Sequence, residues 1–285
     1  MIEFSFELGA QQSELLNVRS KRKFYKLCQE AKLHNLINSA ICESELAAII
    51  KKYGLSDVCD FSGLHISVAK RLTDCVVTAL YMYPKLRSRI CFIGSKKGYM
   101  NALSKLSAYD GEFIKSLGVQ YVLSEASAAK IGQVVADLLN DDKDEWGGQN
   151  TLAHAMYVCG VLDGIILDDK DFGKNDIIQI KLKLKMGALV SHSPKGCASI
   201  ESVIYHEIGH LLDYLCDVSK DKQLSCEYSS MSKSEIKKSL SEYAAISIEE
   251  YIAEGFSEYM STSSPRAAAK RIKEAIDRRY LSLLA

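Results

Sequence analysis

The sequence predicts an α+β fold, and three observations predict it. Over most of the 285 residues, apolar side chains recur at the spacing of amphipathic helices. Between these helical stretches lie a few short apolar runs of strand length. Hydrophobic residues make up 47% and charged residues 25% of the chain, which is sufficient to bury a sizeable core. We expect a helical N-terminal region over residues 1–60 and a second domain, which contains the strands, over residues 61–285.

The first part of the chain is predicted to be mainly helical. Residues 13–53 carry apolar side chains near a spacing of 3.6, and Gly54 is a suitable stop. A second helix over residues 65–83 is predicted to end at Pro84, because a proline cannot continue a helix. The run RICFIG at residues 89–94 is short and apolar, which predicts a strand.

The pattern changes in the middle of the chain. A mostly helical stretch over residues 106–139, with a break near Gly118, precedes two short apolar runs at residues 154–159 and 163–167. Because only a short glycine-containing segment separates these runs, they are predicted to form a hairpin or a pair of neighbouring strands.

Helices are predicted again after the paired strands. Ser199 is a suitable N-cap for a helix that continues to about residue 216. Ser264 and Pro265 form a cap and a first-turn proline, which predict the start of a final helix. Two further helices are predicted over residues 176–186 and 248–260.

Charge and cysteine content exclude several classes of protein. The 36 basic and 36 acidic residues balance, whereas a general nucleic-acid binder normally has a basic excess. No apolar run reaches the roughly 18 residues of a membrane-spanning helix, and the N-terminus lacks the pattern of a secretory signal. The 9 cysteines are odd in number and scattered along the chain, which argues for a reducing compartment, and they show no CxxC spacing, which argues against a structural zinc site. We expect a protein made in the cytoplasm that binds neither nucleic acid nor membranes.

The strongest chemical signal is the motif HEIGH at residues 206–210. On a helix, residues four apart lie on one face, so His206 and His210 can direct imidazole nitrogens at one metal ion. Glu207 lies beside them and can act as general base towards a zinc-activated water. Apolar residues surround the motif at helical spacing, and burying these polar groups would be costly without a partner such as zinc.

A catalytic zinc site needs a third protein ligand and one open position. Glu250 and Glu254 are four residues apart in the predicted helix over residues 248–260, so they share a face. Either could bind zinc while the other accepts a hydrogen bond from a ligand histidine. Periodicity alone does not rank the two.

A family resemblance bears on this choice. HEIGH, followed about 40 residues later by the run SEYAAISIEEYIAEGF at residues 241–256, resembles the gluzincin metallopeptidases that include the catalytic domain of anthrax lethal factor and the Pro-Pro endopeptidases. In that group a tyrosine lies seven residues before the ligand glutamate, as Tyr243 lies before Glu250. The resemblance implies Glu250 as zinc ligand, Glu254 as partner of a ligand histidine, and Tyr243 as the hydroxyl that stabilises the oxyanion.

The same resemblance implies a zincin-like fold. In such a fold the HExxH helix lies beneath a small mixed sheet, an edge strand flanks the substrate cleft, and the helix with the third ligand packs across. A second and looser resemblance covers residues 64–260. The order of Tyr83-Pro84, the paired strands, the loop HSPKG at residues 192–196 and the HExxH helix is similar to metallopeptidase-like domains encoded among bacteriophage structural genes.

Three other residues are weaker candidates. Asp213 lies three residues after His210 on the same face and could orient a ligand imidazole, although a solvated aspartate is nearly as good an interpretation. His192 lies in the turn before the HExxH helix and could line the substrate cleft, but a loop histidine without a role is the better interpretation. His154 lies in the predicted edge strand, where it could face either the cleft or solvent.

The predicted function is therefore hydrolysis of peptide bonds in protein or peptide substrates by a zinc-activated water. Two alternatives stay open. The chain could be a virion or assembly component that keeps a zincin fold for binding with little turnover, as the phage resemblance suggests. It could also be an effector protease that is exported without a signal peptide. The sequence does not predict the oligomeric state.

Overall fold

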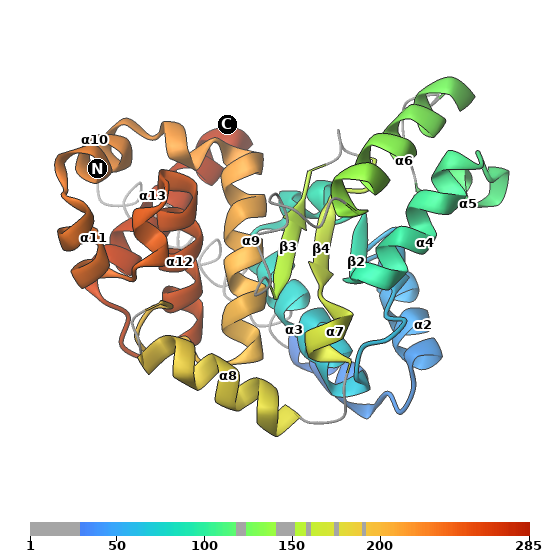
Figure 1. The fold of residues 1–285 in the computed structure, drawn as a ribbon, viewed down its shortest axis with the longest axis horizontal. Helices are drawn as coiled ribbons and strands as arrows, with labels where there is room; N and C mark the ends of the chain where they lie inside the picture. Colours follow the sequence, from blue (N-terminus) through green and yellow to red (C-terminus); the bar gives the residue numbers. More distant parts are fainter. Residues whose placement is uncertain (1–28, 118–123, 141–151, 158–160, 174–176, 190–191) are drawn as a thin grey trace, which may run out of the picture.

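The computed structural model describes residues 29–117, 124–140, 152–157, 161–173, 177–189 and 192–285 (Figure 1). Helices make up most of this part of the chain, and they surround one small four-stranded sheet. The predicted α+β class is therefore confirmed. None of the described helices is both long enough and apolar enough to cross a membrane.

The sheet is mixed, and its strand order is β1-β2-β4-β3. Strands β1 (Val58–Asp60), β2 (Phe92–Ser95) and β4 (Gly164–Leu167) are parallel, whereas β3 (Ala153–Met156) runs antiparallel to β4. The predicted pairing of two strands in the middle of the chain is thus confirmed, and β3 is an edge strand. Strand β2 begins three residues later than predicted, and β1 was not predicted.

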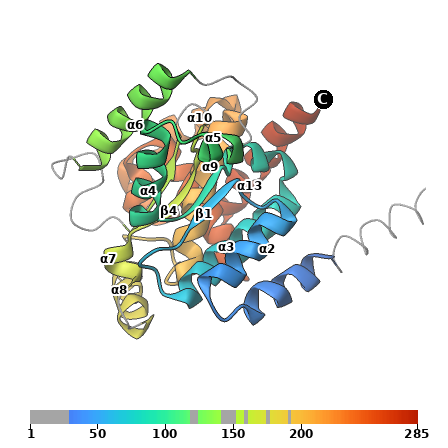
Figure 2. The ribbon, with the colours of Figure 1, turned by 90° about the vertical axis from the view of Figure 1, so that its right-hand side faces the viewer.

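Both faces of the sheet are covered, and the alternation of its side chains shows why. Ile93 and Ile165 point into the larger apolar cluster with helix α3 (Ile66–Met82) and helix α9 (Ile200–Cys216). Phe92 and Ile166, the neighbouring residues, point to the opposite side into a smaller cluster with helix α4 (Lys96–Ser107). Figure 2 shows α3 and α4 on opposite sides of the sheet.

The smaller cluster is completed by α5 (Gly111–Ser116) and α6 (Glu125–Asn140). On the other side, the helix over residues 29–39 and α2 (Glu43–Tyr53) bury Leu33, Ile37, Leu46 and Ile50 in the same cluster as α3. The division of the chain at residue 60 stays a prediction.

The C-terminal third packs as a group of helices on α9. Helix α12 (Ile248–Ser261) lies along α9, and α13 (Ala267–Leu284) packs on α12 (Figure 1). A Cβ atom added at Gly209 would lie 2.8 Å from the Cα of Ala253, so any larger residue at this position would force α9 and α12 apart. Smaller helices fill the periphery: α7 (Asp169–Phe172), α8 (Ile177–Leu189), α10 (Lys222–Ser230) and α11 (Lys233–Ser239).

Several predicted helix ends are confirmed. Gly54 ends α2 with a φ of 61°, a left-handed conformation that favours glycine. Helix α3 ends at Met82, shortly before Pro84. The Ser199 side chain accepts a hydrogen bond from the backbone N–H of Ser202 and so caps α9.

Other helix predictions were wrong or incomplete. The single helix expected over residues 13–53 is interrupted between residue 39 and Glu43, and residues 13–28 lie outside the described part of the chain. The final helix begins at Ala267 with Arg266 as its N-cap, so Ser264 and Pro265 precede the helix and do not open it. Helices α10 and α11 were not predicted, and most of α4 was missed as well, because the predicted helical stretch begins at residue 106 whereas α4 begins at Lys96.

Candidate metal centre

Helix α9 brings two imidazole rings together. His206 and His210 lie one turn apart, and their Nε2 atoms are 3.1 Å from each other. The opposite face of the helix carries Ile204, Ile208 and Leu211, which are fully buried in the core. This burial fixes the rotation of α9, so that both histidines face α12.

Helix α12 adds a carboxylate to the pair. Ser247 caps its first turn and accepts a hydrogen bond from the backbone N–H of Glu250. The Oε2 atom of Glu250 lies 3.2 Å from His206 Nε2 and 3.4 Å from His210 Nε2. This oxygen is buried and makes no hydrogen bond of good geometry, so its contacts with the two nitrogens are electrostatic. Within the described residues, these three side chains form the group of histidines and acids that could hold a metal ion.

The spacing of these three atoms can be compared with the needs of zinc. A tetrahedral ion with bonds of about 2.0–2.1 Å requires ligand atoms about 3.3–3.4 Å apart. The observed separations are 3.1 Å, 3.2 Å and 3.4 Å. Two imidazole nitrogens and a carboxylate oxygen at this spacing fit a shared cation.

The charges of the centre are strongly coupled. Burial raises the pKa of the Glu250 carboxyl, but the adjacent imidazoles of His206 and His210 outweigh it and bring the pKa to about 2. Burial lowers the pKa of His206, but the carboxylates of Glu250 and Glu254 raise it well above its ordinary value. The carboxylates thus create a strongly negative environment that stabilises a positive charge at this point.

Glu254 holds one of the two imidazoles in place. Its Oε1 atom accepts a hydrogen bond of 2.8 Å from His206 Nδ1, which leaves His206 Nε2 directed at the centre. Its Oε2 atom accepts a hydrogen bond of 2.7 Å from the hydroxyl of Ser241, a residue that was not singled out from the sequence. The same hydroxyl accepts a hydrogen bond from the backbone N–H of Ala244, so it ties Glu254 to the turn that carries Tyr243. Nothing in the sequence around Ser241 predicts its hydrogen bond with Glu254.

Glu207 lies on the side of α9 that faces strand β3. Its carboxyl group is buried, and burial raises its pKa, although the positive charge of the neighbouring histidines opposes the rise. The backbone N–H of Ala155 in β3 also interacts with this carboxyl group and lowers its pKa. A carboxyl group with a raised pKa at the edge of a cleft is suited to accept and return a proton.

Tyr243 stands on the other side of the centre. It begins a short 3₁₀ turn, Tyr243–Ala245, and its ring centroid is 5.8 Å from that of His206. Burial raises the pKa of the Tyr243 hydroxyl, and the carboxylates of Glu250, Glu207 and Glu254 raise it further. The hydroxyl therefore keeps its proton and can donate a hydrogen bond.

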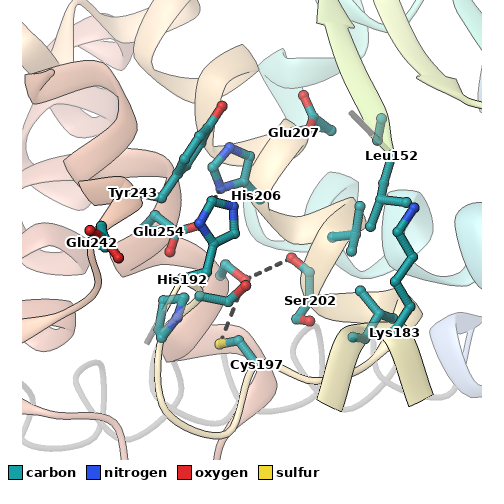
Figure 3. A pocket seen from close by; sticks show the side chains of 16 residues that line it. Leu152, Lys183, His192, Cys197, Ser202, His206, Glu207, Glu242, Tyr243 and Glu254 are labelled. Atoms are coloured by element: carbon teal, nitrogen blue, oxygen red, sulfur yellow. Dashed lines mark hydrogen bonds and ion pairs between the residues drawn. The ribbon is translucent and has the colours of Figure 1, made fainter. Parts of the chain in front are cut away.

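His206, Glu207, Tyr243 and Glu254 line a cleft of about 660 Å³. Figure 3 shows Tyr243 and Glu242 on one side of it and Leu152 and Lys183 on the other. His192 also lines the cleft, and its ring centroid lies 5.4 Å from that of Tyr243. The cleft is thus bounded by α9, by the turn before α12, by helix α8 and by the start of β3.

Two predicted candidates are not among the residues that line the cleft, although both interact electrostatically with His210. Asp213 is buried, and its carboxylate accepts a hydrogen bond of 2.7 Å from the backbone N–H of Ser219, which stabilises the chain after α9. The structure therefore gives it a partner in this turn and no hydrogen bond with an imidazole among the described contacts. His154 lies in β3 opposite Ile166 and is absent from the described lining of the cleft. Burial lowers the pKa of His154 to about 4.

Comparisons of the chain with protein-family profiles, with curated proteins and with solved structures found no match.

Proposed function

We propose that the chain is a zinc-dependent endopeptidase with a zincin-like core. The observation that carries this proposal is the convergence of His206, His210 and Glu250 at the spacing of a tetrahedral ion. Glu207 and Tyr243 line a cleft together with His206, one of these three residues. His₂Glu ligation is typical of catalytic zinc, because it leaves one coordination position open.

Each of the remaining groups has a role in hydrolysis under this proposal. Zinc, when bound by these residues, would lower the pKa of a water molecule to about 7 and polarise the substrate carbonyl. The Glu207 carboxylate takes the proton of the attacking water and later delivers it to the leaving amine. The Tyr243 hydroxyl donates a hydrogen bond to the oxygen that becomes negative in the transition state.

The placement of the edge strand supports a polypeptide as substrate. Strand β3 has a neighbour on one side, and Ala155 in its middle interacts with Glu207. An extended peptide that paired with β3 would therefore bring its backbone past the proposed general base. Main-chain recognition of this kind does not depend on a free terminus of the substrate, which is why we propose an endopeptidase.

The test compares the wild-type chain with Glu207→Gln. Zinc is measured by inductively coupled plasma mass spectrometry, and cleavage is measured with unfolded casein and with a library of peptides blocked at both ends. The glutamine is nearly isosteric and is not a proposed ligand, so about one zinc per chain should remain in both proteins. Activity should fall by at least about 100-fold, because loss of general-base catalysis typically costs 10²–10⁴-fold.

Three results would contradict the proposal. Wild-type protein that takes up no zinc would remove the metal centre. Zinc-loaded protein that cleaves none of these substrates would favour a binding role. Full activity of Glu207→Gln on a verified substrate would show that the general base is wrongly assigned.

A further inference from the structure

Helix α8 is apolar on two faces, although only one of them is buried. Ile180 and Leu184 point into the core. Leu182, Met186 and Leu189 are 56%, 66% and 81% exposed. Because they are four and then three residues apart, these three side chains form one stripe along the outside of the helix. An apolar stripe of this kind is a usual mark of an interaction site.

The stripe is also strongly basic. Lys181 and Lys185 are exposed and lie four residues apart beside Leu182 and Met186. Helix α8 contains no acidic residue. Within the described part of the chain, neither lysine forms an ion pair, whereas Lys183 pairs with Asp171 of α7 at 3.0 Å. We call Leu182, Met186, Leu189 and the two unpaired lysines the α8 stripe.

Helix α8 itself forms part of the wall of the cleft. Lys183 and Leu184, on the same helix, line the cleft directly. Figure 1 shows α8 at the periphery of the molecule, outside α9 and α12, and Figure 3 shows Lys183 at the side of the cleft opposite Tyr243. A polypeptide that leaves the cleft past Lys183 would therefore meet the stripe within a few residues.

We propose that the α8 stripe docks a segment of the substrate protein that combines acidic and apolar side chains, outside the cleft that receives the scissile bond. This inference rests on the proposed peptidase function. The lysines supply charge complementary to acidic residues, and the apolar stripe supplies the area that such a segment can bury. A membrane surface fits less well, because α8 has no aromatic residue and its other apolar face is already packed against the protein.

The first experiment measures docking without catalysis. The probe is a fluorescein-labelled synthetic peptide of alternating leucine and glutamate, whose binding to the full chain in chelator is followed by fluorescence anisotropy. Matched peptides replace leucine by serine or glutamate by lysine. The double variant Leu182→Asp with Met186→Asp should bind the probe at least about tenfold more weakly, whereas Ile41→Asp, at an exposed apolar residue outside α8, should bind it normally. Thermal unfolding of each variant checks that it folds.

The second experiment connects docking to cleavage. A blocked peptide that the wild type cleaves is extended at either end by the same acidic, apolar sequence. One extended peptide should show a kcat/KM at least about tenfold above that of the parent peptide. The double variant should cleave the parent peptide normally and lose this gain, because Leu182 and Met186 do not line the cleft.

The outcomes separate docking from peptidase function. A protein without zinc or activity would refute the proposed function while the anisotropy result still reports on the stripe. Equal binding by wild type and double variant, binding of the serine or lysine peptides, or docking without a gain in cleavage would each overturn the inference. Stronger binding to anionic lipid vesicles, or self-association that the double variant abolishes, would assign the stripe to a membrane or to a second copy.

Discussion

The contact between Gly209 and Ala253 links packing to metal affinity, and Gly209→Ala tests this link. The added Cβ would lie 2.8 Å from Ala253 Cα and 3.3 Å from Ala253 O, whereas carbon atoms normally approach to about 3.5–4.0 Å. Because both of these atoms are backbone, a side-chain rotation does not relieve the overlap. Helices α9 and α12 must therefore separate by roughly 0.7–1 Å.

This separation acts directly on the candidate metal centre. The histidines belong to α9 and Glu250 to α12, so their separations of 3.2 Å and 3.4 Å should increase to about 4 Å, beyond the spacing that a tetrahedral zinc tolerates. Overpacking typically costs about 1–3 kcal/mol, but alanine is favoured over glycine in a helix by about 1 kcal/mol. Net stability should fall by at most about 2 kcal/mol, so zinc affinity is the more sensitive measure.

Zinc affinity is measured by competition with a chromophoric chelator, and stability by thermal unfolding of metal-free protein. We expect Gly209→Ala to bind zinc at least about tenfold more weakly, which corresponds to about 1.4 kcal/mol. Gly111→Ala is the control, because no atom lies within 4 Å of its added Cβ. The double variant with Ala253→Gly should not recover affinity, since the backbone contacts remain. If Gly209→Ala bound zinc with the same affinity and stoichiometry as the wild type, the reasoning would be refuted.

Three further predictions concern buried or partly buried charges. Glu254→Gln should weaken zinc binding by about 10–100-fold in the same competition assay, because His206 loses a charged partner; unchanged affinity would deny Glu254 this role. Arg266→Met should destabilise the protein by about 3–5 kcal/mol in urea unfolding, since it leaves the buried carboxylate of Glu258 without its bidentate partner. Burial raises the pKa of Asp60, but its hydrogen bonds outweigh this effect, so the pKa is lowered. The contribution of Asp60 to stability is therefore present above the ordinary carboxyl pKa and is lost as pH falls through the lowered value. Asp60→Asn should therefore be less stable than wild type at pH 7, and the difference should disappear in acid; a difference that persists at low pH would contradict this.

Helices with strong local signals could be predicted from the sequence. Helix α3 has regular apolar spacing and a proline just beyond its end, and α9 has a serine cap, so both were predicted with nearly correct bounds. Strand β1 has only three residues, and it is defined by pairing with β2 across a crossover that no local pattern reveals. The last helix was placed too early because Ser264 and Pro265 match a common start signal, while Arg266 is fixed at the actual start by its contacts with Glu258.

In the candidate site, too, the local features could be predicted and the features that depend on helix packing could not. The spacing of His206 and His210 within one helix is a local property, and it predicts their proximity. The different positions of Glu250 and Glu254 could not be read from periodicity, because both lie on the same face of α12. They depend on how far α12 is displaced along α9, which places Glu250 at the two Nε2 atoms and Glu254 at His206 Nδ1.

The two edges of the described sheet are short, with three residues in β1 and four in β3. An unpaired strand edge is also a template for association with other chains, and many proteins limit this hazard by keeping edge strands short. Strand β3 offers enough backbone groups to align a brief extended peptide, but too few to start a long intermolecular sheet. Its brevity should therefore protect the protein from edge-to-edge aggregation while leaving the cleft open to a polypeptide.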